Sequence, residues 1–89
     1  MAIASLKIKI MPETSEKIEE IKKGTEETIT KLGGKNISFE LQEVAFGLKA
    51  IIATFAWPES QETSLAEEAI KNISGVSSLD IIDYRRAFG

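Results

Sequence analysis

Three pairs of adjacent glutamates are the side chains of this sequence best suited to bind a metal ion, because hard cations prefer carboxylate oxygens. The pairs are Glu19-Glu20, Glu26-Glu27 and Glu67-Glu68. All three fall in segments with helical periodicity, where neighbouring side chains diverge by about 100° and do not converge on one ion. The chain has no histidine and no cysteine, so the commonest metal ligand, the commonest general base and thiolate chemistry are missing. We therefore expect solvated helix faces, with no metal, no cofactor and no catalytic residue.

Two arginines stand side by side near the end of the chain. Arg85 and Arg86 are the only arginines among eleven basic residues. A guanidinium group binds phosphates and carboxylates through a planar fork of N–H donors. A solvated strand end is the alternative interpretation, and both remain open at this point.

A large aromatic residue stands where the chain has to turn. Phe46 lies between Ala45 and Gly47, at the junction of two apolar segments, and Gly47 favours a bend there. Connecting segments usually run over the surface. Phe46 therefore either folds back onto its own sheet or is held out for a partner to bury.

The charge and the apolar segments of the chain argue against nucleic acid and membranes as partners. The net charge of −3 disfavours direct nucleic-acid binding, which usually needs a basic surface to neutralise phosphates. Lys7 and Lys9 interrupt the apolar N-terminal segment, which therefore lacks the continuous apolar stretch of a secretory signal. No segment approaches the ~20 apolar residues of a membrane span. We expect a cytoplasmic protein that interacts neither with nucleic acid nor with a membrane.

Apolar spacing predicts six elements within a single domain, residues 1–89, since alternation indicates strands and steps of three and four indicate helices. The predicted strands are 3–11, 36–45, 48–57 and 78–84, and the predicted helices are 15–32 and a segment from Ser64 to Gly75. Ser64 and Glu67 have the spacing of a capping box. Strand 48–57 is apolar on both faces and is expected at the centre of its sheet, with Trp57 partly buried at its end.

The predicted order β-α-β-β-α-β is that of a ferredoxin-like α+β sandwich, with two helices on one face of a four-stranded antiparallel sheet. Ala45, Phe46 and Gly47 then lie at the tip of a hairpin, whose first strand turns Ile37, Phe39 and Leu41 toward the core. This fold serves many functions. The loop after the first strand lacks the arginine of an acylphosphatase, and the strands lack the stacking aromatics of RNA-recognition domains. The residues favour a binding domain.

Three segments, in this order and spacing, resemble the archaeal elongation factor 1-beta family, the small guanine-nucleotide exchange factors of translation. They are "KIKIMPE" at the start, "EVAFGLKAI" at the hairpin and "AIKNISGVSSLDIIDYRR" at the end. The resemblance covers essentially the whole chain. It implies one exchange domain, the ferredoxin-like fold and a GTPase partner, elongation factor 1-alpha, which the domain would induce to release GDP.

The resemblance also implies roles for particular residues. The hairpin aromatic of the family corresponds to Phe46, flanked by Ala45 and Gly47, and lodges in the GTPase near the nucleotide site. A lysine of the family that intrudes on the Mg²⁺ and phosphate site corresponds to Arg86, with Arg85 as a second candidate. The alternative function is a small-metabolite-sensing regulatory module of the same topology that acts through a dimer interface.

Overall fold

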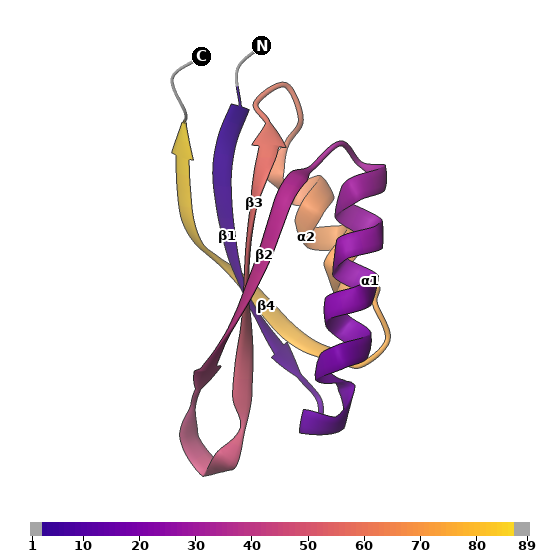
Figure 1. Ribbon diagram of the computed structural model, residues 1–89, viewed down its shortest axis with the longest axis vertical. Helices are drawn as coiled ribbons and strands as arrows, with labels where there is room; N and C mark the ends of the chain where they lie inside the picture. The colour runs from indigo at the N-terminus through magenta and orange to yellow at the C-terminus, as the bar shows by residue number, and fades with distance from the viewer. Residues whose placement is uncertain (1–2, 87–89) are drawn as a thin grey trace.

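The computed structural model describes residues 3–86 as a four-stranded antiparallel sheet with two helices (Figure 1). The elements in chain order are strand β1 Ile3–Pro12, a 3-10 helix Ser15–Lys17, helix α1 Ile18–Lys31, strand β2 Lys35–Glu43, a turn Ala45–Gly47, strand β3 Lys49–Pro58, helix α2 Thr63–Lys71 and strand β4 Val76–Arg86. The ends of the expected domain, residues 1–2 and 87–89, lie outside this description. The strand order β2-β3-β1-β4 confirms the predicted ferredoxin-like α+β fold.

Strand β3 lies inside the sheet, as its composition predicts. It pairs with β1 on one side and with β2 on the other. Ala50, Ile51, Ile52 and Ala53 are all buried, so in this part of the strand the side chains on both faces are removed from solvent. Beyond Ala53 the burial alternates again, with Phe55 and Trp57 buried and Thr54 and Ala56 half-buried. The nearly continuous apolar sequence is typical of a strand that has neighbours on both sides.

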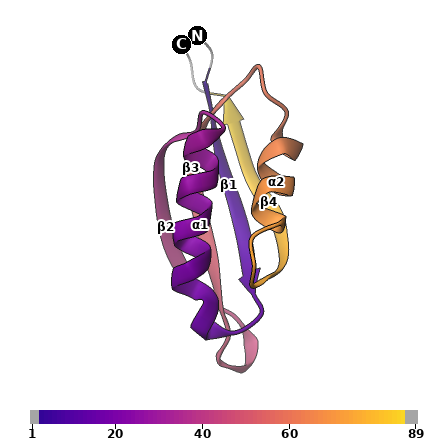
Figure 2. The ribbon, with the colours of Figure 1, turned by 90° about the vertical axis from the view of Figure 1, so that its right-hand side faces the viewer.

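Both helices pack on one face of the sheet and leave the other open (Figures 1 and 2). Helix α1 buries Ile18, Ile21 and Ile29, at spacings that form one stripe of a helix. Helix α2 buries Ala66 and Ile70 in the same way. The strands complete this core, mainly with Leu6, Ile8, Ile10, Ile51, Phe55 and Trp57.

The hairpin of β2 and β3 extends past the helices (Figure 1). Its two strands pair antiparallel up to Glu43 and Lys49. Ile37 and Phe39 pack against the core as expected, but Leu41 is 49% exposed. The prediction that Leu41 belongs to the core is wrong, because this part of β2 extends past α1 and is not covered by it.

Helix α2 begins one residue before the predicted cap. Its N-cap is Glu62, whose side chain makes no capping bond. Ser64 Oγ donates instead to Glu62 Oε2 at 3.3 Å. The predicted capping box is therefore wrong, because the helix already starts after Glu62, whose carbonyl accepts a hydrogen bond from Leu65 N–H at 3.2 Å.

Within residues 3–86, neither helix combines the length and the apolar composition needed to cross a bilayer.

Candidate functional site

The tip of the hairpin holds Phe46 away from its own domain. The side chain is 98% exposed, so the interpretation in which it folds back onto the sheet is wrong. The turn is closed by two backbone hydrogen bonds, Val44 N–H to Leu48 C=O at 2.9 Å and Leu48 N–H to Ala45 C=O at 3.4 Å. The hydrogen-bonded backbone of the turn therefore holds the Phe46 side chain in solvent.

The backbone at this tip lies in a conformation that bulky residues avoid. Phe46 has φ 64° and ψ 31°, and the following Gly47 has φ 75°. The left-handed region costs an L-residue roughly 1–2 kcal/mol, and such strain concentrates at functional sites. Around Gly47, no described atom lies within 4 Å of where a Cβ would stand. Glycine is therefore favoured at this position by the backbone angle and not by lack of space.

Two leucines widen the exposed apolar surface at the same end. Leu41 precedes the turn and Leu48 follows it, and both are exposed. Ala45 is exposed as well. We call Leu41, Ala45, Phe46 and Leu48 the apolar tip. The exposed pair Glu43 and Lys49 lies on the same strand ends. Exposed apolar residues gathered near one turn favour an interaction surface.

At the other end of the molecule, a β-bulge decides where each arginine lies. Lys7 pairs with Asp83 and the next residue, Ile8, pairs with Ile81, so Ile82 is the extra residue of β4. Opposite residues of an antiparallel pair share a face. Arg85, opposite Ser5, therefore lies on the open face, whereas Arg86, opposite Ala4, lies on the face that carries the helices.

Each arginine has a different acidic partner. Arg85 Nε lies 3.1 Å from Asp83 Oδ2, two residues earlier on the same strand. Arg86 Nε lies 3.0 Å from Glu59 Oε1, on the loop between β3 and α2. Both arginine side chains remain 80% exposed. Arg86 therefore forms its ion pair with the loop between β3 and α2, whereas Arg85 forms its ion pair within β4.

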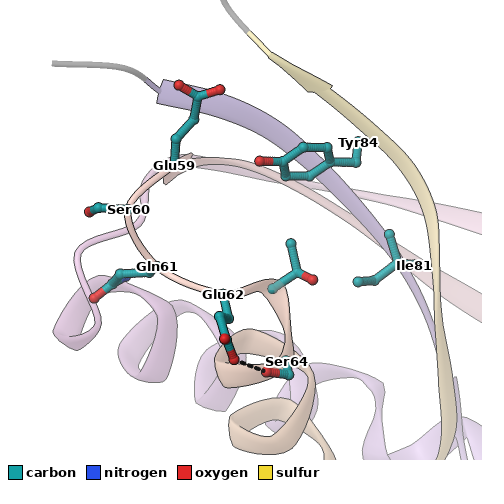
Figure 3. A pocket seen from close by; sticks show the side chains of 8 residues that line it. Glu59, Ser60, Gln61, Glu62, Ser64, Ile81 and Tyr84 are labelled. Carbon is teal, nitrogen blue, oxygen red and sulfur yellow. Dashed lines mark hydrogen bonds between the residues drawn. The ribbon is translucent and has the colours of Figure 1, made fainter.

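A cavity of about 550 Å³ separates this loop from β4 (Figure 3). Glu59 to Glu62 line it on the loop side, and Ile81 and Tyr84 line it from β4. Neither Glu59 nor Tyr84 stands in a motif of the sequence that predicts a site. No local spacing relates them, because only the pairing of β1 with both β3 and β4 brings them to the same end of the sheet.

The two predicted contact sites lie at opposite ends of the molecule (Figure 1). The described fold is 41 Å along its longest axis. Phe46 precedes the start of β3 and Glu59 follows its end, and a strand of this length spans about 30 Å. Phe46 and Arg86 are therefore separated by most of the length of β3, and whether either side chain reaches a nucleotide site stays a prediction.

The adjacent residues Glu19 and Glu20 form ion pairs with two different lysines. Glu20 lies 3.5 Å from Lys17 and Glu19 lies 3.9 Å from Lys22. Across residues 3–86, no group of three or more acidic side chains comes together in a way that could hold a metal ion.

Comparison with known proteins identifies the family. Residues 5–87 match the EF-1 guanine nucleotide exchange domain. Proteins named elongation factor 1-beta are similar along almost the whole chain. The one from Methanocella arvoryzae is 34% identical over 99% of this chain and 100% of its own. Those from Metallosphaera sedula and Sulfolobus acidocaldarius are 34% and 35% identical over 89% of this chain and 89% and 90% of their own lengths. The chain, with its exposed hairpin aromatic and its C-terminal cation, belongs to the family of EF-1 guanine nucleotide exchange domains.

Proposed function

We propose that this chain acts as a single exchange domain that accelerates the release of GDP from elongation factor 1-alpha in the cytoplasm. Its role is to bind the GTPase, and no side chain of its own makes or breaks a covalent bond. The membership of the EF-1 exchange-domain family supports the reaction. The observation that carries the contact is Phe46, which is 98% exposed at a strained turn.

The physical requirement for such a factor is a difference in affinity. A GTPase holds its nucleotide through Mg²⁺ and a cradle around the phosphates. A protein that binds the nucleotide-free form more tightly than the loaded form weakens nucleotide binding by the same factor, by thermodynamic linkage. An exchange factor therefore needs contacts that compete with Mg²⁺ or with the phosphates, and it needs no catalytic groups.

The two ends of the domain fit two different parts of this task. Arg86 carries a positive charge on an exposed side chain. A guanidinium group can supply part of the positive charge that Mg²⁺ otherwise provides to the phosphates. The four side chains of the apolar tip carry no charge themselves, with Glu43 and Lys49 beside them, and they suit an apolar pocket on a second surface of the GTPase. A domain 41 Å long that is anchored at both ends binds in a defined orientation.

The test is the release of a fluorescent GDP analogue from the cognate elongation factor 1-alpha. Substoichiometric amounts of the chain should accelerate the release, because each molecule dissociates and acts again. The chain alone should not hydrolyse GTP. Unchanged release over a broad range of concentrations would refute the proposed function.

A further inference from the structure

The loop that carries Glu59 is held by contacts to two other elements. Gln61 Nε2 donates to the carbonyl of Leu32, at the end of α1, at 2.8 Å. Trp57 Nε1 donates to the carbonyl of Gln61 at 3.3 Å, and the Trp57 ring is fully buried against Phe55. These contacts fix the backbone beside Glu59 to the core of the domain. A side chain on this loop can therefore serve as a fixed reference point.

Glu59 directs its carboxylate toward the end of β4. The side chain is only 20% exposed, and its Oε1 lies 3.0 Å from Arg86 Nε. That oxygen is buried and accepts no hydrogen bond of good geometry from the described residues. The charge of Arg86 is therefore the contact that compensates this buried oxygen.

The contact leaves the far end of Arg86 in solvent. It is made through Nε, the guanidinium nitrogen nearest the backbone, and the side chain as a whole is 80% exposed. An arginine held at Nε still has N–H donors on both Nη atoms with which to bind an anion. A free arginine side chain has about 2 kcal/mol of rotamer entropy to lose on binding, and an arginine held in advance loses less of it.

We propose that Glu59 is a positioning residue for Arg86: its carboxylate holds the guanidinium at the end of β4, with the Nη atoms directed toward the phosphate-binding region of the partner GTPase. This inference rests on the proposed function. It assigns a role to a loop residue that makes the exchange step faster without itself contacting the nucleotide. Because the pair is largely exposed on the arginine side, its effect is modest.

The experiment compares Glu59→Gln, Arg86→Ala and the double variant by release of the GDP analogue at saturating and subsaturating concentrations of the chain. Glu59→Gln removes the charge with little change of shape. We expect it to slow the maximal rate roughly two- to fivefold, which corresponds to the loss of one partly exposed ion pair. The concentration that gives half of the maximal rate should change little. In the Arg86→Ala background, Glu59→Gln should have no further effect.

Glu68→Gln is the matched control, because Glu68 is exposed on α2 and takes part in none of the ion pairs described. Glu59→Asp keeps the charge on a side chain shorter by one methylene, and we expect it to recover part of the rate. All variants are compared below their melting midpoints, so that a loss of folding is not read as a loss of exchange.

The outcomes separate the two proposals. If Arg86→Ala slows exchange and Glu59→Gln does not, the positioning role is wrong while the exchange function stands. A faster Glu59→Gln would mean that the ion pair restrains Arg86, which also overturns the inference, as would equal slowing by Glu59→Gln with and without Arg86. If the wild-type chain accelerates nothing, the proposed function itself fails.

Discussion

The hairpin tip and the end of β4 present their exposed groups in different ways. Phe46 is presented by a turn whose backbone lies in the left-handed region, and its side chain is almost wholly in solvent. Arg86 is held at Nε by a carboxylate on a loop that is itself fixed to α1 and to the core. Backbone geometry thus fixes the position of Phe46 at the tip. Side-chain contacts between segments distant in sequence fix the position of Arg86 at the end of β4.

This difference fits the two contacts that we propose for these groups. Burial of apolar area is non-directional, so an aromatic ring needs only to protrude and to find a pocket. Hydrogen bonds from a guanidinium to phosphate depend on angle and distance, so a cation gains more from being aimed. The side-chain contact between Arg86 and Glu59 lies at the end for which we propose the directional contact.

The largest effect that we expect is on binding, from Phe46→Ala. The ring has almost no contacts within the domain, so its loss should change the free energy of unfolding by less than about 0.5 kcal/mol. Loss of a buried aromatic anchor at an interface typically costs ~2 kcal/mol, or about thirtyfold in affinity or exchange efficiency. The melting midpoint and the exchange rate of the same variant test this. A large drop in melting midpoint with preserved exchange would mean that the ring serves its own core.

A smaller effect should follow from Arg86→Ala. We expect about tenfold slower exchange, the size of one lost charged hydrogen bond of ~1.5 kcal/mol. The free energy of unfolding should fall by about 0.5–1 kcal/mol, because Glu59 loses its partner and the pair is mostly exposed on the arginine side. Arg85→Ala should matter less, since Arg85 lies on the open face beside Asp83. Equal activity of the wild type and the double alanine variant would exclude a role for either cation.

Gly47→Ala tests whether backbone geometry alone holds the tip. With φ at +75°, an alanine should cost roughly 1–2 kcal/mol of stability through the strained backbone. No described neighbour is close enough to clash with the added methyl group. We expect a lower melting midpoint together with weaker binding, because the turn can relax only by moving Phe46. A neutral result in both measurements would show that the turn does not depend on this angle.

The smallest effect should appear in the salt dependence. Added salt screens exposed charges over the Debye length, about 10 Å at 0.1 M, and it leaves apolar contacts largely intact. The ratio of wild-type to Arg86→Ala exchange rates should therefore shrink by roughly twofold as salt rises. The ratio for Phe46→Ala should stay constant. A parallel decline of both ratios would contradict the division of the two ends into a charged and an apolar contact.

Much of the fold is encoded locally and could be predicted. Period-two and period-three-to-four spacing reports which side of a segment is buried, so strands and helices appear in the right order. The central place of β3 follows from its two apolar faces, and the exposed turn at Phe46 follows from its glycine neighbour. The predictions are wrong where contacts with other elements set the burial of a side chain. Trp57 is fully buried and not partly buried, because it contacts the Gln61 loop and Phe55.

The arrangement of the two ends was decided by tertiary structure. A single extra residue, Ile82, reverses the alternation of β4, so Arg86 rather than Arg85 shares a face with the helices and meets Glu59. Such a bulge depends on the pairing with β1 and leaves no reliable local pattern. The separation of Phe46 from Arg86 likewise depends on strand register. The sequence by itself determined the order of the elements and the place of an aromatic residue in the turn and of two arginines near the end of the last strand, because these are properties of short segments. Only the packed sheet determined that the aromatic residue and the arginines lie at opposite ends, because register and bulges are set between strands.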